Sequence, residues 1–314
     1  MRPARIQESC TNISGLLLIL AAALTGVACE DDFNPRADFS RRLAVFAILD
    51  PVNPVQTVRL AWSYDAEVRI PPEPLTEREV KEAQVRVIRG GQRYDFHDTL
   101  VTTEDGRSLV AWVNSDFAPQ PDQEYRLEVT VPGHHTVTSA ITLPSRMYAR
   151  AELVRPDTGV SVIRAYHGVP AFRTPPAGFY YRLWVENTTL NPGTSDTLVL
   201  RHEIPLRHDR QTGTWVYPAP AREETEVFTT AILKEIAERE VAASDSVLNR
   251  RVILQTYALE SNFYAWYKIV RGFDDPVSLR LDQADVSFID GGLGVFGGVI
   301  SDSAIYTYVR FMRE

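Results

Sequence analysis

The feature that most constrains the fold of this chain is an alternation of apolar and polar residues over short segments. In 57–64 the even positions are large and apolar (Val58, Leu60, Trp62), whereas the odd positions are small or polar. Segments 125–131 and 179–186 repeat the pattern. Because successive side chains of a strand point to opposite faces, this period of two predicts strands with one buried face. The sequence therefore predicts an all-β protein.

Turn-forming residues divide the first part of the chain into short strands. Gly90-Gly91, Asp105-Gly106 and Pro132-Gly133 lie between the alternating segments. About 100 residues of this kind predict an immunoglobulin-like or fibronectin III-like β-sandwich over residues 42–145.

Residues 146–314 are predicted to form a second, β-rich C-terminal domain with one or two short helices. Apolar residues such as Val227, Phe228 and Ala231 recur at spacings of three and four, which predicts a helix near residues 222–243. Ser261 could cap a second short helix, because serine is a preferred helix N-cap.

The N-terminus has the order of a lipoprotein signal peptide over residues 1–28. A basic stub precedes the apolar run 16–24, small residues follow at 26–28, and Cys29 comes directly after them. The run is short and interrupted for a membrane-spanning helix, which needs about 20 apolar residues. Because Cys10 lies inside the leader, Cys29 would be the sole cysteine of the mature chain and could form no internal disulfide. We therefore expect acylation of Cys29; the alternative is a soluble export signal that leaves a free thiol.

Residues 29–41 are predicted to be an acidic, flexible tether. Glu30, Asp31 and Asp32 follow Cys29 at once, an arrangement that looks like the export signal of lipoproteins on the outer face of the Bacteroidota outer membrane. The resemblance implies lipid anchoring in the outer membrane, facing the cell exterior. One alternative is an anchor that faces the periplasm. The other is that the acids serve only as a solvated tether.

The charge of the chain excludes two classes of partner. Its formal net charge is −8, and the mature chain is more negative, because the leader holds two arginines and one glutamate. Nucleic acids and anionic lipid surfaces both select basic proteins. We therefore predict no nucleic-acid partner and attachment to the membrane through acyl chains alone.

Motifs of catalysis are either absent or incomplete. Gly292, Gly294 and Gly297 match G-x-G-x-x-G, but the residues that follow favour a strand, whereas a dinucleotide fingerprint must open a helix. The glycines are better explained by a turn or by close approach of another backbone. The single Asp157-Thr158-Gly159 has no second copy, as an aspartic protease would need. There is no G-x-S-x-G nucleophile motif.

Metal ligation is not supported by the histidines. His202 and His208 flank Glu203 but lack the H-E-x-x-H spacing, although a site from these two histidines stays open as an alternative. We predict no cofactor, no metal and no enzymatic activity.

Two tryptophans are the candidate contacts for a ligand or partner. Trp184 alternates with the buried set of its strand and therefore points the other way, and Trp215 lies at a predicted turn tip after Gly213. Exposed aromatic rings bind sugars and apolar ligands and act as interface anchors. Packing between the two domains is the alternative explanation for both.

Two segments give a family resemblance: 259–264 (LESNFY) and, above all, the glycine-rich 286–297 (VSFIDGGLGVFG). They resemble the Bacteroidota lipoprotein family called domain of unknown function 4249, which usually has Ser-Asn-Ile before its double glycine where this chain has Ser287-Phe288-Ile289-Asp290. The motif residues, expected to form a structural turn, are Gly291, Gly292, Gly294, Phe296 and Gly297. The resemblance implies an accessory lipoprotein found with TonB-dependent outer-membrane transporters.

The sequence thus predicts a non-catalytic binding module on the outer membrane, which could act with such a transporter in nutrient uptake. The alternatives are a structural or adhesion lipoprotein without a small-molecule ligand and, further behind, a hydrolase. The sequence does not identify the ligand.

Overall fold

The computed structural model describes residues 41–63, 80, 82–102, 106, 108–156, 159–168, 171–190, 196–220, 224–239, 246–270 and 287–312. The predicted leader, Cys29, the acids at 30–32 and Asp157 lie outside these ranges. Most described residues are in strands, so the predicted all-β class is confirmed. None of the helices in the described ranges is long and apolar enough to cross a membrane.

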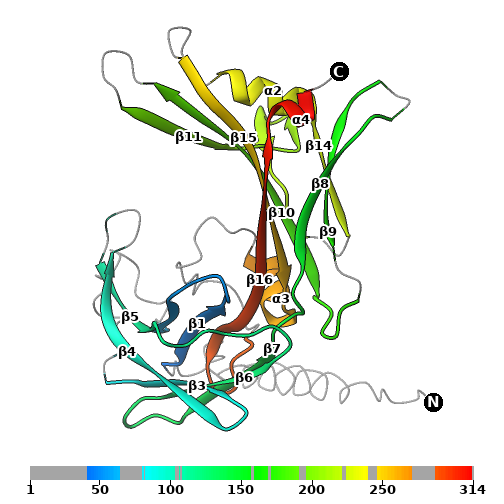
Figure 1. The fold of residues 1–314 in the computed structure, drawn as a ribbon. Coiled ribbons are helices and arrows are strands. Elements are labelled where there is room, and N and C mark those ends of the chain that lie inside the picture. Colours follow the sequence, from blue (N-terminus) through cyan, green and yellow to red (C-terminus); the bar gives the residue numbers. More distant parts are fainter. Residues whose placement is uncertain are drawn as a thin grey trace, which may run out of the picture. The chain divides into compact units, whose positions relative to one another are not determined.

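In the described ranges, seven strands form the N-terminal sandwich (Figure 1). They are β1 (Leu43–Leu49), β2 (Gln56–Trp62), β3 (Gln84–Arg89), β4 (Gln92–Thr102), β5 (Ser108–Asn114), β6 (Glu124–Thr130) and β7 (Val137–Thr142). Their order is β1-β2-β5-β4-β3-β6-β7, and every neighbouring pair is antiparallel. Strand β4 joins the two layers, because residues 92–96 pair with β3 and residues 97–102 pair with β5.

The core of the sandwich comes from the alternating residues that the sequence singles out. Val58, Leu60 and Leu127 are all buried. Tyr125 is fully buried near the start of β6, and its hydroxyl accepts a hydrogen bond of 2.6 Å from the backbone N–H of Gln120. This return of a tyrosine hydroxyl to the backbone upstream is the tyrosine corner of immunoglobulin-like sandwiches.

The described residues of the C-terminal part form a second set of strands and three short helices. The strands are β8 (Tyr148–Val154), β9 (Val162–Gly168), β10 (Gly178–Leu190), β11 (Thr197–Glu203), β12 (Arg207–Asp209), β13 (Thr214–Val216), β14 (Thr225–Thr229), β15 (Ser246–Leu259) and β16 (Leu293–Thr307). The helices are α2 (Thr230–Arg239), α3 (Ser261–Val270) and α4 (Val309–Met312).

Strand β16 joins the two parts into one sheet of eleven strands (Figure 1). Its first half pairs in parallel with β1, and its second half pairs antiparallel with β15. Residues 41–314 accordingly form one compact unit. The boundary predicted at 145–146 lies between β7 of the eleven-stranded sheet and β8 of a three-stranded sheet, and the division into two domains stays a prediction.

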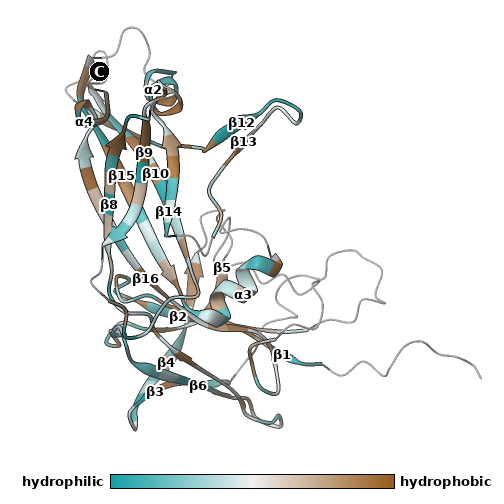
Figure 2. Cartoon of the chain, turned by 90° about the vertical axis from the view of Figure 1, so that its right-hand side faces the viewer, coloured by the Kyte–Doolittle hydropathy of each residue, from teal (hydrophilic) through white to brown (hydrophobic). Residues whose placement is uncertain are grey.

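A three-stranded sheet, β14-β9-β8, packs against β15 and β16. The backbone N–H of Ala149 on β8 donates to Asp302 Oδ2 at 2.7 Å, and that of Ala151 donates to the hydroxyl of Tyr306 at 2.8 Å. Side chains of β16 thus satisfy the free edge of β8. Figure 2 shows apolar and polar residues alternating along β8, β10 and β15, as expected for strands with one buried face.

Two helix predictions need correction. The helix expected near 222–243 begins only at Thr230, because Thr225–Thr229 forms β14 and pairs with β9. That pairing outweighs the helical spacing of the apolar residues. The second helix does begin at Ser261, but its cap is Glu260, whose carboxylate accepts the N–H groups of Asn262 and Phe263 at 2.9 and 3.3 Å.

Candidate functional site

A cavity of about 960 Å³ lies between the sandwich strands and the long C-terminal strands. One wall comes from β1, β2, β4 and β5, and the other comes from β10, β11, β15, β16 and α3. Its lining is mainly aromatic and aliphatic, with four charged side chains: Asp50, Arg59, Arg182 and Glu203. The aromatic side chains that line it are Phe46, Tyr180, Trp184, Tyr217, Tyr257, Phe263 and Tyr267.

The alternation of β10 places its polar and aromatic side chains in this cavity. Tyr180, Arg182 and Trp184 line it, whereas Leu183 and Val185 between and beyond them are fully buried in the core. Directly opposite on β15, Tyr257 pairs with Tyr180 and Gln255 pairs with Arg182. On the other side, Glu203 of β11 pairs with Trp184. Neighbouring strands therefore bring these side chains onto one face.

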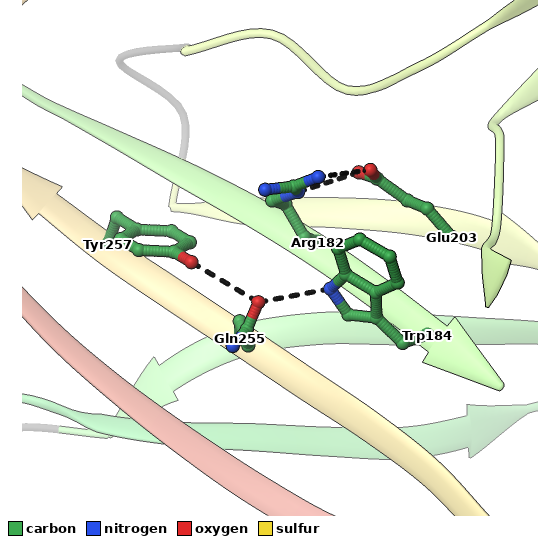
Figure 3. Close-up of polar contacts among 5 residues, drawn as sticks. All are labelled: Arg182, Trp184, Glu203, Gln255 and Tyr257. Atoms are coloured by element: carbon green, nitrogen blue, oxygen red, sulfur yellow. Dashed lines mark hydrogen bonds and ion pairs between the residues drawn. The ribbon is translucent and has the colours of Figure 1, made fainter. Parts of the chain in front are cut away.

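Hydrogen bonds fix these side chains relative to one another (Figure 3). Arg182 donates to both carboxylate oxygens of Glu203, with 2.9 Å between Nε and Oε1. Gln255 Oε1 accepts from Trp184 Nε1 at 3.0 Å and from the Tyr257 hydroxyl at 3.2 Å. Burial opposes the charged form of Arg182, but the hydrogen bond and charge of Glu203 outweigh it and raise the pKa of Arg182.

Trp184 also binds two cations through its ring. The guanidinium carbon of Arg182 lies 4.5 Å from the ring centroid, and that of Arg201 lies 4.6 Å from it. These distances are within the range of a cation–π interaction. The indole is therefore held both through its N–H and through its π system.

Three tyrosines of the cavity lie close together. The ring centroid of Tyr180 is 5.7 Å from that of Tyr257 and 6.4 Å from that of Tyr267. Burial raises the pKa of Tyr180 and of Tyr257, so both hydroxyls stay neutral at physiological pH. Phe263 and Tyr267, four residues apart on α3, present one face of the helix to the same space.

Asp50 lies in the turn between β1 and β2, in contact with Ser301 of β16, the residue that pairs with Tyr257 of β15. Its Oδ1 accepts the N–H of Val52 at 3.0 Å, and the hydroxyl of Ser301 on β16 lies 3.2 Å from each of its oxygens. Gln56 holds the turn, because its side chain accepts from the N–H of Asp50 and donates to the carbonyls of Asp50 and Asn53. Burial raises the pKa of Asp50 in spite of these hydrogen bonds.

A family model described as "Domain of unknown function (DUF4249)" matches residues 30–304 of the chain. The chain belongs to this family. A search of curated proteins found no match. The DUF4249 match includes every residue that lines the cavity and the acids at 30–32.

The glycine motif of this DUF4249 chain lies where β16 pairs with β1. Gly294 has a φ of +100°, and a Cβ there would lie 2.1 Å from the carbonyl oxygen of Val45 on β1. Gly291 also has a positive φ, whereas Phe296 is fully buried in the core. The glycines thus allow the parallel pairing of β16 with β1, and the carbonyl of Gly292 accepts a hydrogen bond of 2.8 Å from Arg42 Nη2.

Of the two predicted contact residues, only Trp184 lines the cavity. Trp215 lies on β13, where its ring is T-shaped to that of His208, with 4.7 Å between the ring centroids, and packs partly against the core. His202 lies on β11, and within the described ranges no group of three or more His, Cys, Asp or Glu could hold a metal ion.

Sequence reasoning missed Asp50, Arg182, Glu203, Gln255 and Tyr257. The alternation around Trp184 indicates the face of Arg182, but nothing in one sequence states which residues of β11 and β15 lie opposite. Asp50 sits in a turn whose Asp-Pro start gives no indication of a cavity.

Proposed function

We propose that this DUF4249 protein is a non-catalytic ligand-binding lipoprotein of the outer membrane, acting with a TonB-dependent transporter in nutrient uptake. The observation that carries the proposal is the aromatic-lined cavity of about 960 Å³. Small-molecule sites are concave, mostly apolar and furnished with a few fixed polar groups. Arg182, Glu203 and Gln255 are polar groups of this kind, since hydrogen bonds hold each of them in place.

A concave aromatic site favours a small ligand over the alternative of a structural or adhesion lipoprotein. An adhesion surface would present its aromatic rings on a flat patch to a protein partner. Among the described residues, seven aromatic side chains line one cavity.

A hydrolase has one observation in its favour, because Asp50 and Glu203 both line the cavity. Glu203, however, is bound bidentately by Arg182. A role as nucleophile or general acid would require that pair to break. Binding without catalysis therefore fits the arrangement better.

The attachment is proposed from the N-terminal residues, and the partner is proposed from the family resemblance. Acylation of Cys29 would anchor the protein, and Glu30, Asp31 and Asp32 would direct it to the outer face of the membrane, with the periplasmic face as the alternative. The transporter is proposed on the family resemblance. Affinity purification of the tagged chain in mild detergent should recover it, and repeated recovery without any transporter would contradict this part of the proposal.

A pair of matched variants tests the cavity itself. Val55 and Val52 lie in the same turn and are both exposed, but only Val55 lines the cavity. Val55→Trp should fill part of the hollow and weaken binding of any small molecule that co-purifies with the protein, as detected by native mass spectrometry. Val52→Trp should leave the bound molecule in place. Equal retention by both variants would place the ligand outside the cavity.

A further inference from the structure

Among the charged side chains that line the cavity, Asp50 has no cationic partner within the described part of the chain. Arg182 and Glu203 neutralise each other, and Arg59 already has an interaction of its own. The partners of Asp50 are the N–H of Val52 and the hydroxyl of Ser301, which are both uncharged. Among the described residues, therefore, no cationic side chain balances the negative charge of Asp50.

An ionised Asp50 at this position lowers the stability of the protein, and yet hydrogen bonds fix the turn that carries it. Removing a carboxylate from water is unfavourable unless a cation or enough hydrogen-bond donors replace the lost solvation. For Asp50 burial outweighs its two hydrogen-bond donors and raises its pKa. Yet Gln56 fixes the turn around it through three hydrogen bonds, and Ser301 contacts both oxygens. A carboxylate that is held in place in this way is suited to form an ion pair with a cationic group of a ligand.

The aromatic side chains next to Asp50 have the complementary chemistry. Tyr257 is close enough for the negative charge of Asp50 to contribute to its raised pKa. Tyr180 lies beside Tyr257, and Tyr267 lies beside Tyr180. The π faces of such rings attract cations, and the same sheet face already does so at Trp184, which two guanidinium groups approach.

Resting on the proposed function of the cavity, we infer that its ligand carries a positively charged amine, which forms an ion pair with Asp50 beside the face of Tyr257. The remaining hollow is far larger than one amine and takes the apolar body of the ligand against the tyrosines and α3. In this arrangement Asp50 forms the ion pair with the ligand, whereas the Arg182–Glu203 pair offers hydrogen bonds to its polar groups.

Three probes of similar shape test the inference: benzylamine, benzyl alcohol and benzoate, which are cationic, neutral and anionic at pH 7. Binding to the full chain carrying Cys29→Ser is measured by saturation-transfer NMR and calorimetry. We expect benzylamine to bind roughly tenfold more tightly than benzyl alcohol, as for a hydrogen bond to a charged group, and benzoate to bind least. Asp50→Asn should abolish this preference. Asp302→Asn, a change on β16 outside the cavity lining, should preserve it.

The outcomes separate the inference from the proposed function. If benzyl alcohol or benzoate binds as well as benzylamine, and Val55→Trp blocks that binding, the cavity is a ligand site but the amine inference is wrong. An unchanged preference in Asp50→Asn also overturns the inference. If none of the three probes binds, the amine inference is wrong, while the proposed ligand site is decided by whether Val55→Trp loses the co-purified molecule. A loss of benzylamine binding counts in favour only when Asp50→Asn melts at or above the wild-type temperature, which excludes unfolding as the cause.

Discussion

The Cβ atom that Gly297 lacks would lie only 2.6 Å from the Cβ of Phe263. Gly297 belongs to β16 and Phe263 to the first turn of α3, so the helix rests directly on the backbone of the strand. This close approach carries Phe263 and Tyr267 into the cavity wall. Gly297, a residue of the glycine motif that does not line the cavity, thereby positions two residues that do.

We predict that Gly297→Ala destabilises the protein by about 1–3 kcal/mol, the usual cost of forcing an extra methyl group into a packed interior. Urea unfolding should show a lower midpoint. Gly168→Ala is the control, because a Cβ there would meet the end of the flexible Arg150 side chain, which can move aside. Equal midpoints for the two variants would mean that the packing of α3 on β16 tolerates a methyl group at position 297.

Asp50→Asn should raise the stability of the protein at pH 7. The pKa of Asp50 is raised above its ordinary value of 3.8, so its contribution to stability is fully present below that value and is lost as the pH rises through the folded-state pKa. At neutral pH the wild type therefore carries an unfavourable buried charge, which asparagine removes. Thermal melts should show the variant above the wild type at pH 7, with the difference shrinking toward pH 3. A constant difference across this range would contradict burial of the charge as its cause.

Breaking the Arg182–Glu203 ion pair should lower the free energy of unfolding by about 2 kcal/mol. Only 27% of the Arg182 side chain and 14% of the Glu203 side chain is exposed, so removing one partner leaves a poorly solvated charge. Arg182→Met should destabilise, and adding Glu203→Gln should recover most of the loss in a double-mutant cycle. Glu235→Gln breaks the exposed pair with Arg239 and should cost about 0.5 kcal/mol or less. A coupling energy near zero for Arg182 and Glu203 would show that solvent screens this pair as well.

Cys29→Ser should abolish incorporation of a labelled fatty acid and release the protein from the membrane fraction, because the net charge of −8 provides no electrostatic attachment. Radiolabelling and cell fractionation measure the two effects. Continued sedimentation of the serine variant with membranes would rule out the acyl chain as the sole attachment.

Replacing Glu30, Asp31 and Asp32 with alanine should leave acylation intact but reduce cleavage by protease added to whole cells. The expected reason is retention on the inner side of the outer membrane. If the protease cleaves the variant and the wild type equally, the acids serve only as a tether.

The sequence predicts what depends on local periodicity. The alternation in 57–64 and 179–186 correctly places β2 and β10 and the direction of Trp184, because a strand's faces follow from its own residues. It does not predict that β16 lies between β1 and β15. The hydrogen bond of Ser301 with Asp50 joins residues that are 251 positions apart in the sequence. The hydrogen bond of Arg42 with Gly292 joins residues that are 250 positions apart. Such contacts depend on which strand edges meet, and no local pattern encodes that choice.

For the same reason the predicted helix at 222–243 is too long. Val227 and Phe228 fit either period, and pairing of Thr225–Thr229 with β9 decides in favour of a strand. Glu260, rather than Ser261, caps α3, because Ser261 is already the first residue of the helix.

The position of β16 has a consequence for the order of folding. Strand β1 pairs in parallel with a strand about 250 residues away. One side of β1 therefore stays without hydrogen-bond partners until residues 293–298 pair with it. Parallel pairing over such a separation is intrinsically slow, since a long loop must close first. A chain cut before residue 293 would therefore expose the edges of both β1 and β15 and would be prone to pair with other chains. Strand β16 therefore connects the sandwich strands and the long C-terminal strands in one sheet.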